Sequence, residues 1–289
     1  MAREPNNAIN NAILIRCGEI ALKGKNRINF ENKLISNIEK ATGIRSKRTS
    51  GRLILHPEKK DPGKISKQLR KVFGITSISV AKEISLDMEK IKEEALEQSK
   101  GKKFANFRIT VQRLQKRLKT SPEIERDIGA FVVEKTGKKV KLKEPELEIS
   151  IEIAENAYVF TERIKCFGGL PTGIEGNVAL FFDNKVNGKK TILAGLLMMK
   201  RGCNVYPFSH KKQDTMLLEE YGSKPLTIIK NIDELEKEAE NKNCRASVIG
   251  QTFEDLKNSA DIETRMVVLK PLIGFDEGEA RKRLGEFKR

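Results

Sequence analysis

The sequence predicts a protein of mixed α/β and α+β class with more than one domain. Its 289 residues exceed what one compact core usually holds. Over residues 1–82, the predicted elements follow the order β-α-β-β-α-β. From residue 177 onward, predicted strands and helices alternate, which is typical of a parallel sheet covered by helices on both faces.

Residues 1–82 have the element order of a ferredoxin-like domain. Short apolar runs predict its strands, and apolar residues at helical spacing predict its helices. Ser50-Gly51 lies between the second and third strands and is typical of a hairpin turn. The predicted strands are Ala12–Cys17, Ile44–Lys47, Arg52–His56 and Ile75–Lys82, and the predicted helices are Phe30–Ala41 and Ile65–Phe73.

Residues 83–166 predict a second, smaller α/β unit. The strand Phe104–Val111 alternates apolar and polar residues, as a half-buried strand does. A helix follows it, and we expect Ser121 as its N-cap and Pro122 as its first residue. The predicted helices are Asp87–Gln98 and Ile124–Thr136, and the further strands are Val140–Leu142, Leu147–Ala154 and Tyr158–Ile164.

Residues 167–176 are rich in Gly and Pro and predict a linker, and residues 177–289 predict the parallel α/β domain. We expect Thr191 to be the N-cap of its first helix. The predicted strands are Val178–Phe182, Val205–Phe208, Leu226–Ile229, Ala246–Ile249 and Val267–Leu269, and the predicted helices are Thr191–Arg201, Asp214–Tyr221, Asp233–Asn241 and Asp276–Leu284.

The net charge of +16 indicates a polyanionic partner rather than a neutral metabolite. Residues 1–165 hold 36 Lys and Arg against 22 Asp and Glu, a net charge of +14, whereas residues 166–289 hold 20 against 18, a net charge of +2. The basic excess therefore belongs to the first half. We expect nucleic acid to be its partner, with an anionic membrane surface as the less favoured alternative.

Four cations follow the strand Phe104–Val111 and precede the next helix: Arg113, Lys116, Arg117 and Lys119. Lys and Arg gathered at such a junction suit a phosphate chain, because they release the counterions condensed on it. A solvated charged turn explains the same residues equally well.

The four cysteines, Cys17, Cys166, Cys203 and Cys244, are far apart and form no C-x-x-C pair, so no zinc or redox motif is predicted. No apolar run of about eighteen residues predicts a membrane span. We expect a reduced, cytoplasmic protein that holds no metal.

The loop before Thr191 is the place where a parallel α/β domain would bind a nucleotide. Such a loop needs glycines that let backbone N–H groups approach phosphate, and only Gly188 is present. A Walker A motif would need Gly at position 183 and Ser or Thr at position 190, so the match fails. We expect the side chains of both histidines to be exposed to solvent, His56 at the surface and His210 in a loop.

Several segments together resemble the tRNA 4-thiouridine synthetase family, also called tRNA sulfurtransferases. That resemblance implies an N-terminal ferredoxin-like domain, a THUMP domain and a PP-loop ATP pyrophosphatase domain of the Rossmann-like type. The similar segments are Arg16–Arg27, Phe107–Gly129, Gly168–Gly173, Met198–Gly202, Gln251-Thr252 and Pro271–Gly274.

One segment departs from the family. The resemblance places the family's S-G-G-x-D-S loop on Val186–Thr191, where Asn187, Gly188, Lys189, Lys190 and Thr191 stand. The first Ser and Gly are lost, and Lys190 replaces the Asp that implies magnesium and ATP binding. We therefore expect a degenerate PP-loop, no ATP or magnesium cofactor, and no confident catalytic residue.

The resemblance and the charge together predict tRNA binding through the THUMP domain. Two alternatives stay open: an active sulfurtransferase with an altered or partner-supplied ATP and magnesium site, or a structural role in which the C-terminal domain docks or forms a homodimer. A sulfur-donor or catalytic partner protein is a further expectation. The expected RNA contacts are Lys23, Lys25, Arg27, Lys103, Arg108, Arg113, Lys116, Arg117 and Lys119.

Overall fold

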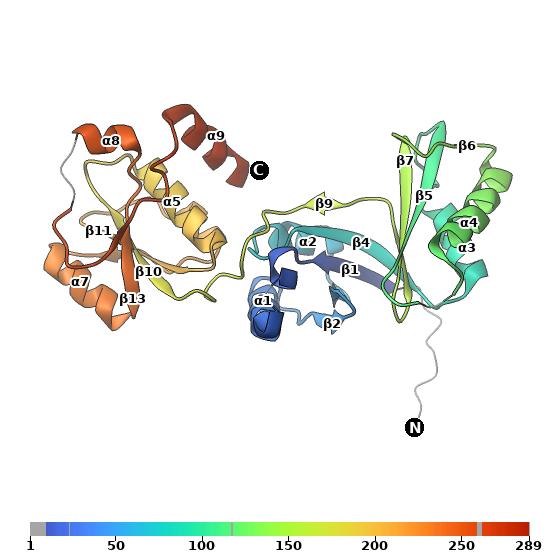
Figure 1. The fold of residues 1–289 in the computed structure, drawn as a ribbon, viewed down its shortest axis with the longest axis horizontal. Helices are drawn as coiled ribbons and strands as arrows, with labels where there is room; N and C mark the ends of the chain where they lie inside the picture. The colour runs from blue at the N-terminus through green and yellow to red at the C-terminus, as the bar shows by residue number, and fades with distance from the viewer. Residues whose placement is uncertain (1–9, 23, 117, 259–261, 289) are drawn as a thin grey trace, which may run out of the picture. The chain divides into compact units, whose positions relative to one another are not determined.

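The computed structural model describes residues 10–22, 24–116, 118–258 and 262–288 (Figure 1). The chain divides into two compact units. The first comprises Met1–Cys17, Ile38–Arg70 and Ile75–Cys166, and the second comprises Gly18–Asn37, Lys71–Gly74 and Phe167–Arg289. Within the described ranges, no helix is both long and apolar enough to cross a membrane.

The first unit is built on a nine-stranded sheet in the order β2-β3-β1-β4-β8-β7-β5-β6, with β9 paired to β4. The predicted α+β class is confirmed, and most element bounds lie within a few residues of those predicted. The strands are β1 Asn10–Arg16, β2 Lys47–Thr49, β3 Arg52–Leu55, β4 Ser77–Ile84, β5 Asn106–Arg113, β6 Lys139–Val140, β7 Leu147–Ile153, β8 Ala157–Phe160 and β9 Ile164–Lys165. The α-helices are α2 Pro62–Arg70, α3 Met88–Glu97 and α4 Ser121–Thr136, and α1 Arg27–Thr42 is divided between the units.

Strand β4 joins the two halves of this sheet. It pairs antiparallel with the whole of β1, and its far end pairs with β8 at Lys82↔Val159. The ferredoxin-like strands and the strands of the second half are therefore one continuous sheet. Sequence spacing did not predict this pairing, because the two partners lie far apart in the chain.

Helices α3 and α4 cover one face of the second half of the sheet (Figure 1). Alternate residues of β5, Phe107, Ile109 and Val111, point into this core, and Ile124 and Ile128 of α4 meet them there. Burying such side chains contributes about 1.5–3 kcal/mol each. The residues between them, including Arg108, lie on the opposite face of the strand.

A buried ion cluster ties the two halves of the unit together. Glu152 on β7 is 1% exposed and accepts hydrogen bonds from Arg16 Nε and Nη2, at 3.0 and 2.6 Å, and from Arg52 Nε at 2.9 Å. Arg16 also donates to Ser79 and lies over the ring of Phe160. Arg163 lies farther from the same carboxylate, at 3.8 Å. A buried carboxylate with guanidinium partners from both halves is satisfied only while the halves stay in register.

Two local predictions are wrong in this unit. His56 is half-buried rather than at the surface, because its Nε2 lies 2.6 Å from Glu83 Oε2. The α4 N-cap is Thr120 rather than Ser121, since the amide and the hydroxyl of Thr120 both donate to the Glu123 carboxylate. Either hydroxyl residue suits a cap, and Glu123 is three residues beyond Thr120, the spacing of a capping box.

The second unit contains a five-stranded parallel sheet in the order β12-β11-β10-β13-β14. Helices α5 and α9 pack on one face of this sheet and α7 packs on the other (Figure 1). The alternation of strands and helices along the sequence predicts this arrangement. The strands are β10 Asn177–Phe182, β11 Asn204–Ser209, β12 Thr227–Ile228, β13 Cys244–Val248 and β14 Val268–Leu269. The helices are η1 Glu19–Leu22, η2 Gly24–Asn26, α5 Gly188–Lys200, α6 Met216–Glu220, α7 Ile232–Asn241, α8 Phe253–Asn258 and α9 Glu277–Phe287.

The predicted linker, residues 167–176, is hydrogen-bonded to the end of α5. The amide of Leu170 donates to Lys200 O at 2.9 Å, and the amide of Gly173 donates to Gly202 O at 2.7 Å, so this segment satisfies carbonyls at the end of α5. Gly169 has φ +79°, and a Cβ there would lie 2.3 Å from Lys200 O. Only glycine allows this approach.

Candidate functional site

The loop that follows β5 is held in shape by its own cations. Arg113 Nη1 donates to Lys119 O at 3.0 Å, and Lys119 Nζ pairs with Asp127 at 2.9 Å. That hydrogen bond and charge raise the pKa of Lys119 and lower the pKa of Asp127. Lys116 is exposed and has no ion-pair partner among the residues described. Two of the predicted phosphate contacts therefore also organise the loop, and Lys116 is available to a ligand.

The β2–β3 hairpin lies against this loop. Gln115 Nε2 donates to Ser50 Oγ at 3.2 Å, and Arg52 Nη2 donates to Gln112 Oε1 at 3.0 Å. Strand β2 of this hairpin carries two exposed cations, Lys47 and Arg48, which as consecutive strand residues lie on opposite faces of the sheet. Sequence reasoning missed these two residues, because only the long-range contact of the hairpin tip places them here.

The remaining predicted contacts are not gathered at this loop. Lys103 precedes β5 and therefore lies at the other end of that strand, whose eight residues span about 26 Å. Arg108 donates to Leu142 O from the middle of β5. Lys25 and Arg27 belong to the second compact unit, where Arg27 pairs with Glu31. Lys23 and Arg117 lie outside the described residues.

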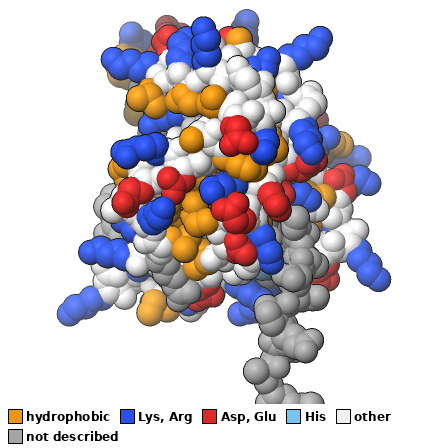
Figure 2. All heavy atoms as spheres, turned by 90° about the vertical axis from the view of Figure 1, so that its right-hand side faces the viewer, with side chains coloured by type: hydrophobic (Ala, Val, Ile, Leu, Met, Phe, Trp, Pro, Cys, Tyr) orange, Lys and Arg blue, Asp and Glu red, His pale blue; other side chains and the backbone are white. Residues whose placement is uncertain are grey.

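Figure 2 shows one face of the molecule with Lys and Arg side chains projecting around its rim. Asp and Glu side chains lie among them nearer the centre, with apolar patches between. On this face the cations form separate groups rather than one uninterrupted positive surface. Net charge alone therefore does not describe how the cations are arranged on this face.

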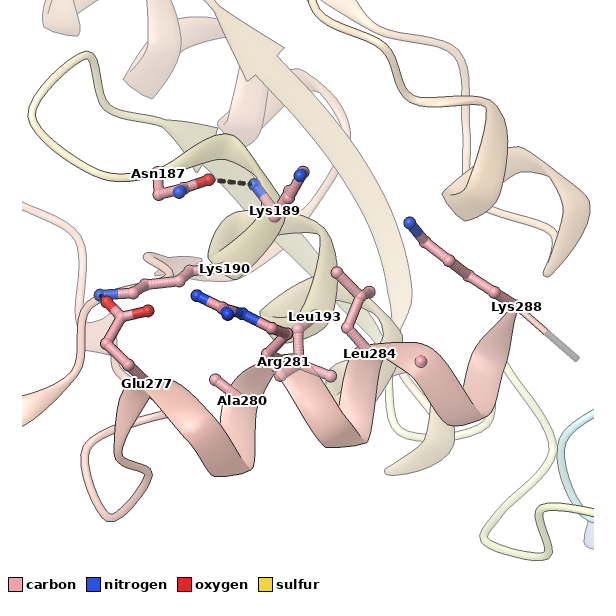
Figure 3. Close-up of a pocket in the computed structure, with 10 residues that line it drawn as sticks. Asn187, Lys189, Lys190, Leu193, Glu277, Ala280, Arg281, Leu284 and Lys288 are labelled. Atoms are coloured by element: carbon pink, nitrogen blue, oxygen red, sulfur yellow. Dashed lines mark hydrogen bonds and ion pairs between the residues drawn. The ribbon is translucent and has the colours of Figure 1, made fainter.

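In the second unit, the loop after β10 leads into α5 without a glycine-rich turn. The α5 N-cap is Asn187, whose side chain accepts from the amide of Lys189 at 3.0 Å (Figure 3). The expected cap, Thr191, is instead buried inside the helix, so that prediction is wrong. The sequence pattern did not predict that α5 begins at Gly188, because Gly188, Lys189 and Lys190 show no apolar periodicity.

Lys190 lies at the position where the resemblance places the family's Asp, and it is 7% exposed. Its ammonium lies 2.9 and 3.1 Å from the carboxylate oxygens of Asp255. It also pairs with Glu277 of α9 (Figure 3). Burial alone would lower the pKa of Lys190, but the hydrogen bonds that its ammonium donates to Glu277 and Asp255 outweigh burial and raise that pKa. The ammonium of Lys190 therefore forms ion pairs with both nearby carboxylates, those of Asp255 and Glu277.

The two carboxylates at this loop are not free to coordinate magnesium. A divalent cation needs free oxygen ligands, and at this loop the carboxylates of Asp255 and Glu277 are already paired with an ammonium group. A cavity of about 360 Å³ does lie beside it, lined also by Lys189, Arg281 and Lys288 (Figure 3). These three cations could attract a simple anion, but they supply no metal ligand.

The segment after β13 packs directly on the start of α5. A Cβ at Gly250 would lie 2.4 Å from Thr191 N, so glycine is required there. Gln251 and Thr252 are buried, and Thr252 donates to Asp255 from both its amide and its hydroxyl at 2.8 Å. The residues that resemble the family here hold the Lys190 partner in place.

Three of the cysteines lie in settings that disfavour the thiolate. Burial raises the pKa of Cys166 and of Cys244 to about 11, and it also raises the pKa of Cys203. His210 is a half-buried residue, not a solvated one: its Nδ1 lies 3.2 Å from Ile229 O, and its ring meets Phe181 edge-on. Among the described residues, no group of three or more His, Cys, Asp or Glu could hold a metal ion.

Comparison with known families gives two matches. The description "ThiI ferredoxin-like domain" matches residues 12–79, and "THUMP domain" matches residues 85–162. A probable tRNA sulfurtransferase of Alkaliphilus oremlandii is 33% identical over 227 residues, 72% of this chain and 57% of that protein. One of Thermococcus kodakarensis is 34% identical over 212 residues, 68% of this chain and 54% of that protein. The chain thus spans little more than half the length of these curated relatives.

Two solved structures are similar over 96% of this chain. PH1313 from Pyrococcus horikoshii OT3 aligns with a TM-score of 0.81 and 29% identity over its whole length. A 4-thiouridine synthetase, solved as an RNA complex with bound ATP, aligns with a TM-score of 0.79 and 25% identity over 85% of its length. With its ferredoxin-like domain, THUMP domain and parallel α/β domain in the same order, the chain belongs to the tRNA sulfurtransferase family.

Proposed function

We propose that this protein binds tRNA through its THUMP domain and acts in 4-thiouridine modification without an ATP site of its own. The THUMP match, the sulfurtransferase relatives and the RNA bound to the 4-thiouridine synthetase support the first part. The net charge of +14 over residues 1–165 agrees with it. The proposal places the protein in the cytoplasm, with tRNA as its partner.

The observation that carries the second part is the pairing of Lys190 with Asp255 and Glu277. Where the family has an acid that implies magnesium binding, this chain has a cation already satisfied by two carboxylates. Replacing water around Lys190 by two fixed anions favours the charged lysine, as its raised pKa indicates. We infer that adenylation, where it is needed, comes from a partner protein, and a sulfur donor is the alternative role for such a partner.

The RNA part is tested by a double substitution at the loop and hairpin, Lys47→Ala with Lys116→Ala. We expect weaker tRNA binding and a log Kd against log salt slope smaller by about two, because each lysine contacts one phosphate. Mobility-shift titrations at several salt concentrations measure both quantities. Lys64→Ala with Lys67→Ala, two exposed cations on α2, is the matched control and should leave the slope unchanged.

An unchanged slope in the Lys47 and Lys116 variant would remove the loop and hairpin from the RNA interface. Mass spectrometry of tRNA from a strain lacking this chain tests the biological part. We expect 4-thiouridine to be reduced, and an unchanged 4-thiouridine content would contradict a role in that modification.

A further inference from the structure

A second cavity, of about 860 Å³, lies along the later half of α5 in the same unit. Four of the segments that resemble the family contribute to its lining. Glu19 comes from Arg16–Arg27, Gly169 from Gly168–Gly173, Lys200 from Met198–Gly202 and Pro271 from Pro271–Gly274. Lys190 and Lys200 are separated by about 15 Å of helix, so this cavity is distinct from the loop before α5.

The charges around this cavity are predominantly positive. Lys200, Arg201, Lys270 and Arg283 line it, and Glu19 is the one carboxylate in the lining. The whole of residues 166–289 has a net charge of only +2, so these cations are a local concentration. Burial and then the charge of Arg283 lower the pKa of Lys200, as expected of ammonium and guanidinium groups placed together. Glu19 and Glu286 act in the opposite direction on Lys200, and Arg283 is paired with Glu286 at 2.7 Å. Lys200 and Arg201 are therefore the cations of this lining best placed to meet an anion.

The floor of the cavity is apolar. Leu197, Met198, Leu269 and Phe275 line it, and all four are half-buried. Methionine and phenylalanine offer surfaces on which a planar base can stack. Such a cavity is complementary to a nucleotide, because its apolar walls suit the base and the cations at its rim suit the phosphate.

Duplex RNA is too wide for a cavity of this volume, whereas one or two unstacked nucleotides fit within it. We propose that this pocket holds unpaired nucleotides of the bound RNA, with phosphates at Lys200 and Arg201 and a base against Met198 and Phe275. The inference rests on the proposed RNA-binding function and adds a subsite in the C-terminal domain. It gives that domain a role in RNA recognition that needs neither ATP nor magnesium.

The test uses the full chain and two RNA probes, a stem with an unpaired 3′ tail and the same stem with a blunt end. We expect the unaltered protein to bind the tailed stem about tenfold more tightly, the effect of stacking one base. Lys200→Gln with Arg201→Gln should abolish that preference and leave blunt-stem affinity nearly unchanged. Lys211→Gln with Lys212→Gln, which removes two exposed charges outside the pocket, should keep the preference.

Because Lys200 is half-buried, Arg201→Glu at an exposed position provides a second variant that preserves packing. It should lower the preference for the tail by at least threefold, with an unchanged urea midpoint. A tail preference that survives in both pocket variants, or equal binding of both stems by the unaltered protein, would overturn the inference. Tight binding of AMP without RNA would overturn it in favour of a free-nucleotide site.

The outcomes separate this inference from the function on which it rests. If the unaltered protein binds neither stem, the proposed RNA binding itself fails and the subsite falls with it. If it binds both stems but the pocket variants match the Lys211 and Lys212 control, RNA binding stands and only the subsite is wrong.

Discussion

The two ends of α5 carry lysines in opposite electrostatic settings. Lys190 near the start of the helix is held by Asp255 and Glu277, and its pKa is raised. Lys200 at the end has no ion-pair partner among the described residues, and its pKa is lowered by burial and by Arg283. The first lysine stabilises the fold as part of a closed ion pair. The second is the lysine for which we propose a ligand, so segments that resemble one family at the two ends of a helix can have opposite electrostatic settings.

The largest expected effects come from the glycines that pack against each end of α5. We expect Gly169→Ala and Gly250→Ala each to lower the free energy of unfolding by about 3 kcal/mol, because the new Cβ would meet helix backbone at 2.3 and 2.4 Å. Urea unfolding measures the change. Gly222→Ala is the control: its φ is also positive, at +93°, but its Cβ would meet nothing within 4 Å, so about 1 kcal/mol is expected. Equal effects in all three variants would contradict close packing at the helix ends.

Removing the internal cation is the next largest effect. Lys190→Met keeps the side-chain length but leaves Asp255 and Glu277 without their partner, so we expect a loss of about 2 kcal/mol after allowing for the exposure of Glu277. Lys189→Met removes the neighbouring exposed charge and should change stability by less than about 0.5 kcal/mol. A stable Lys190→Met protein would mean that the ion pair does not hold the start of α5.

The smallest effect is a difference in pH dependence. A raised pKa means that the contribution of Lys190 is full below its unfolded pKa of about 10.4 and is lost as pH rises through the folded value. A lowered pKa means that folding opposes protonation of Lys200, so stability rises as pH approaches about 10.4. The free energy of unfolding is measured against pH for the unaltered protein, for Lys190→Met and for Lys200→Met. The difference between the unaltered protein and each variant should change with pH in opposite directions for the two lysines between about pH 9 and 11. Slopes of the same sign would remove the contrast between the two ends.

Local sequence patterns predict the elements well and the site only in part. The apolar runs of β1 and β10 and the helical spacing in α4 depend on neighbours in the chain, so each was found within a few residues. The short helix α8 was missed, because six largely polar residues give no periodicity. The pairing of β4 with β8 was also missed, because it is a long-range contact.

The candidate sites show the same limit. Lys190 was recognised as a departure from the family loop, but its partners Asp255 and Glu277 lie more than sixty residues away and carry no motif. The second cavity was not predicted at all, because its cations come from separate segments that only the fold brings together. Sequence identifies which residues are unusual, and tertiary contacts decide what they do.

One titration tests the central claim most directly: calorimetry of ATP with magnesium, injected into the full chain already saturated with tRNA. A first titration with tRNA brings the chain to saturation, and the proposed RNA binding predicts a saturable signal in that step. The ATP step should then show only heat of dilution, because the ammonium of Lys190 occupies both carboxylates near the loop. Stoichiometric ATP binding in that second step would contradict the account.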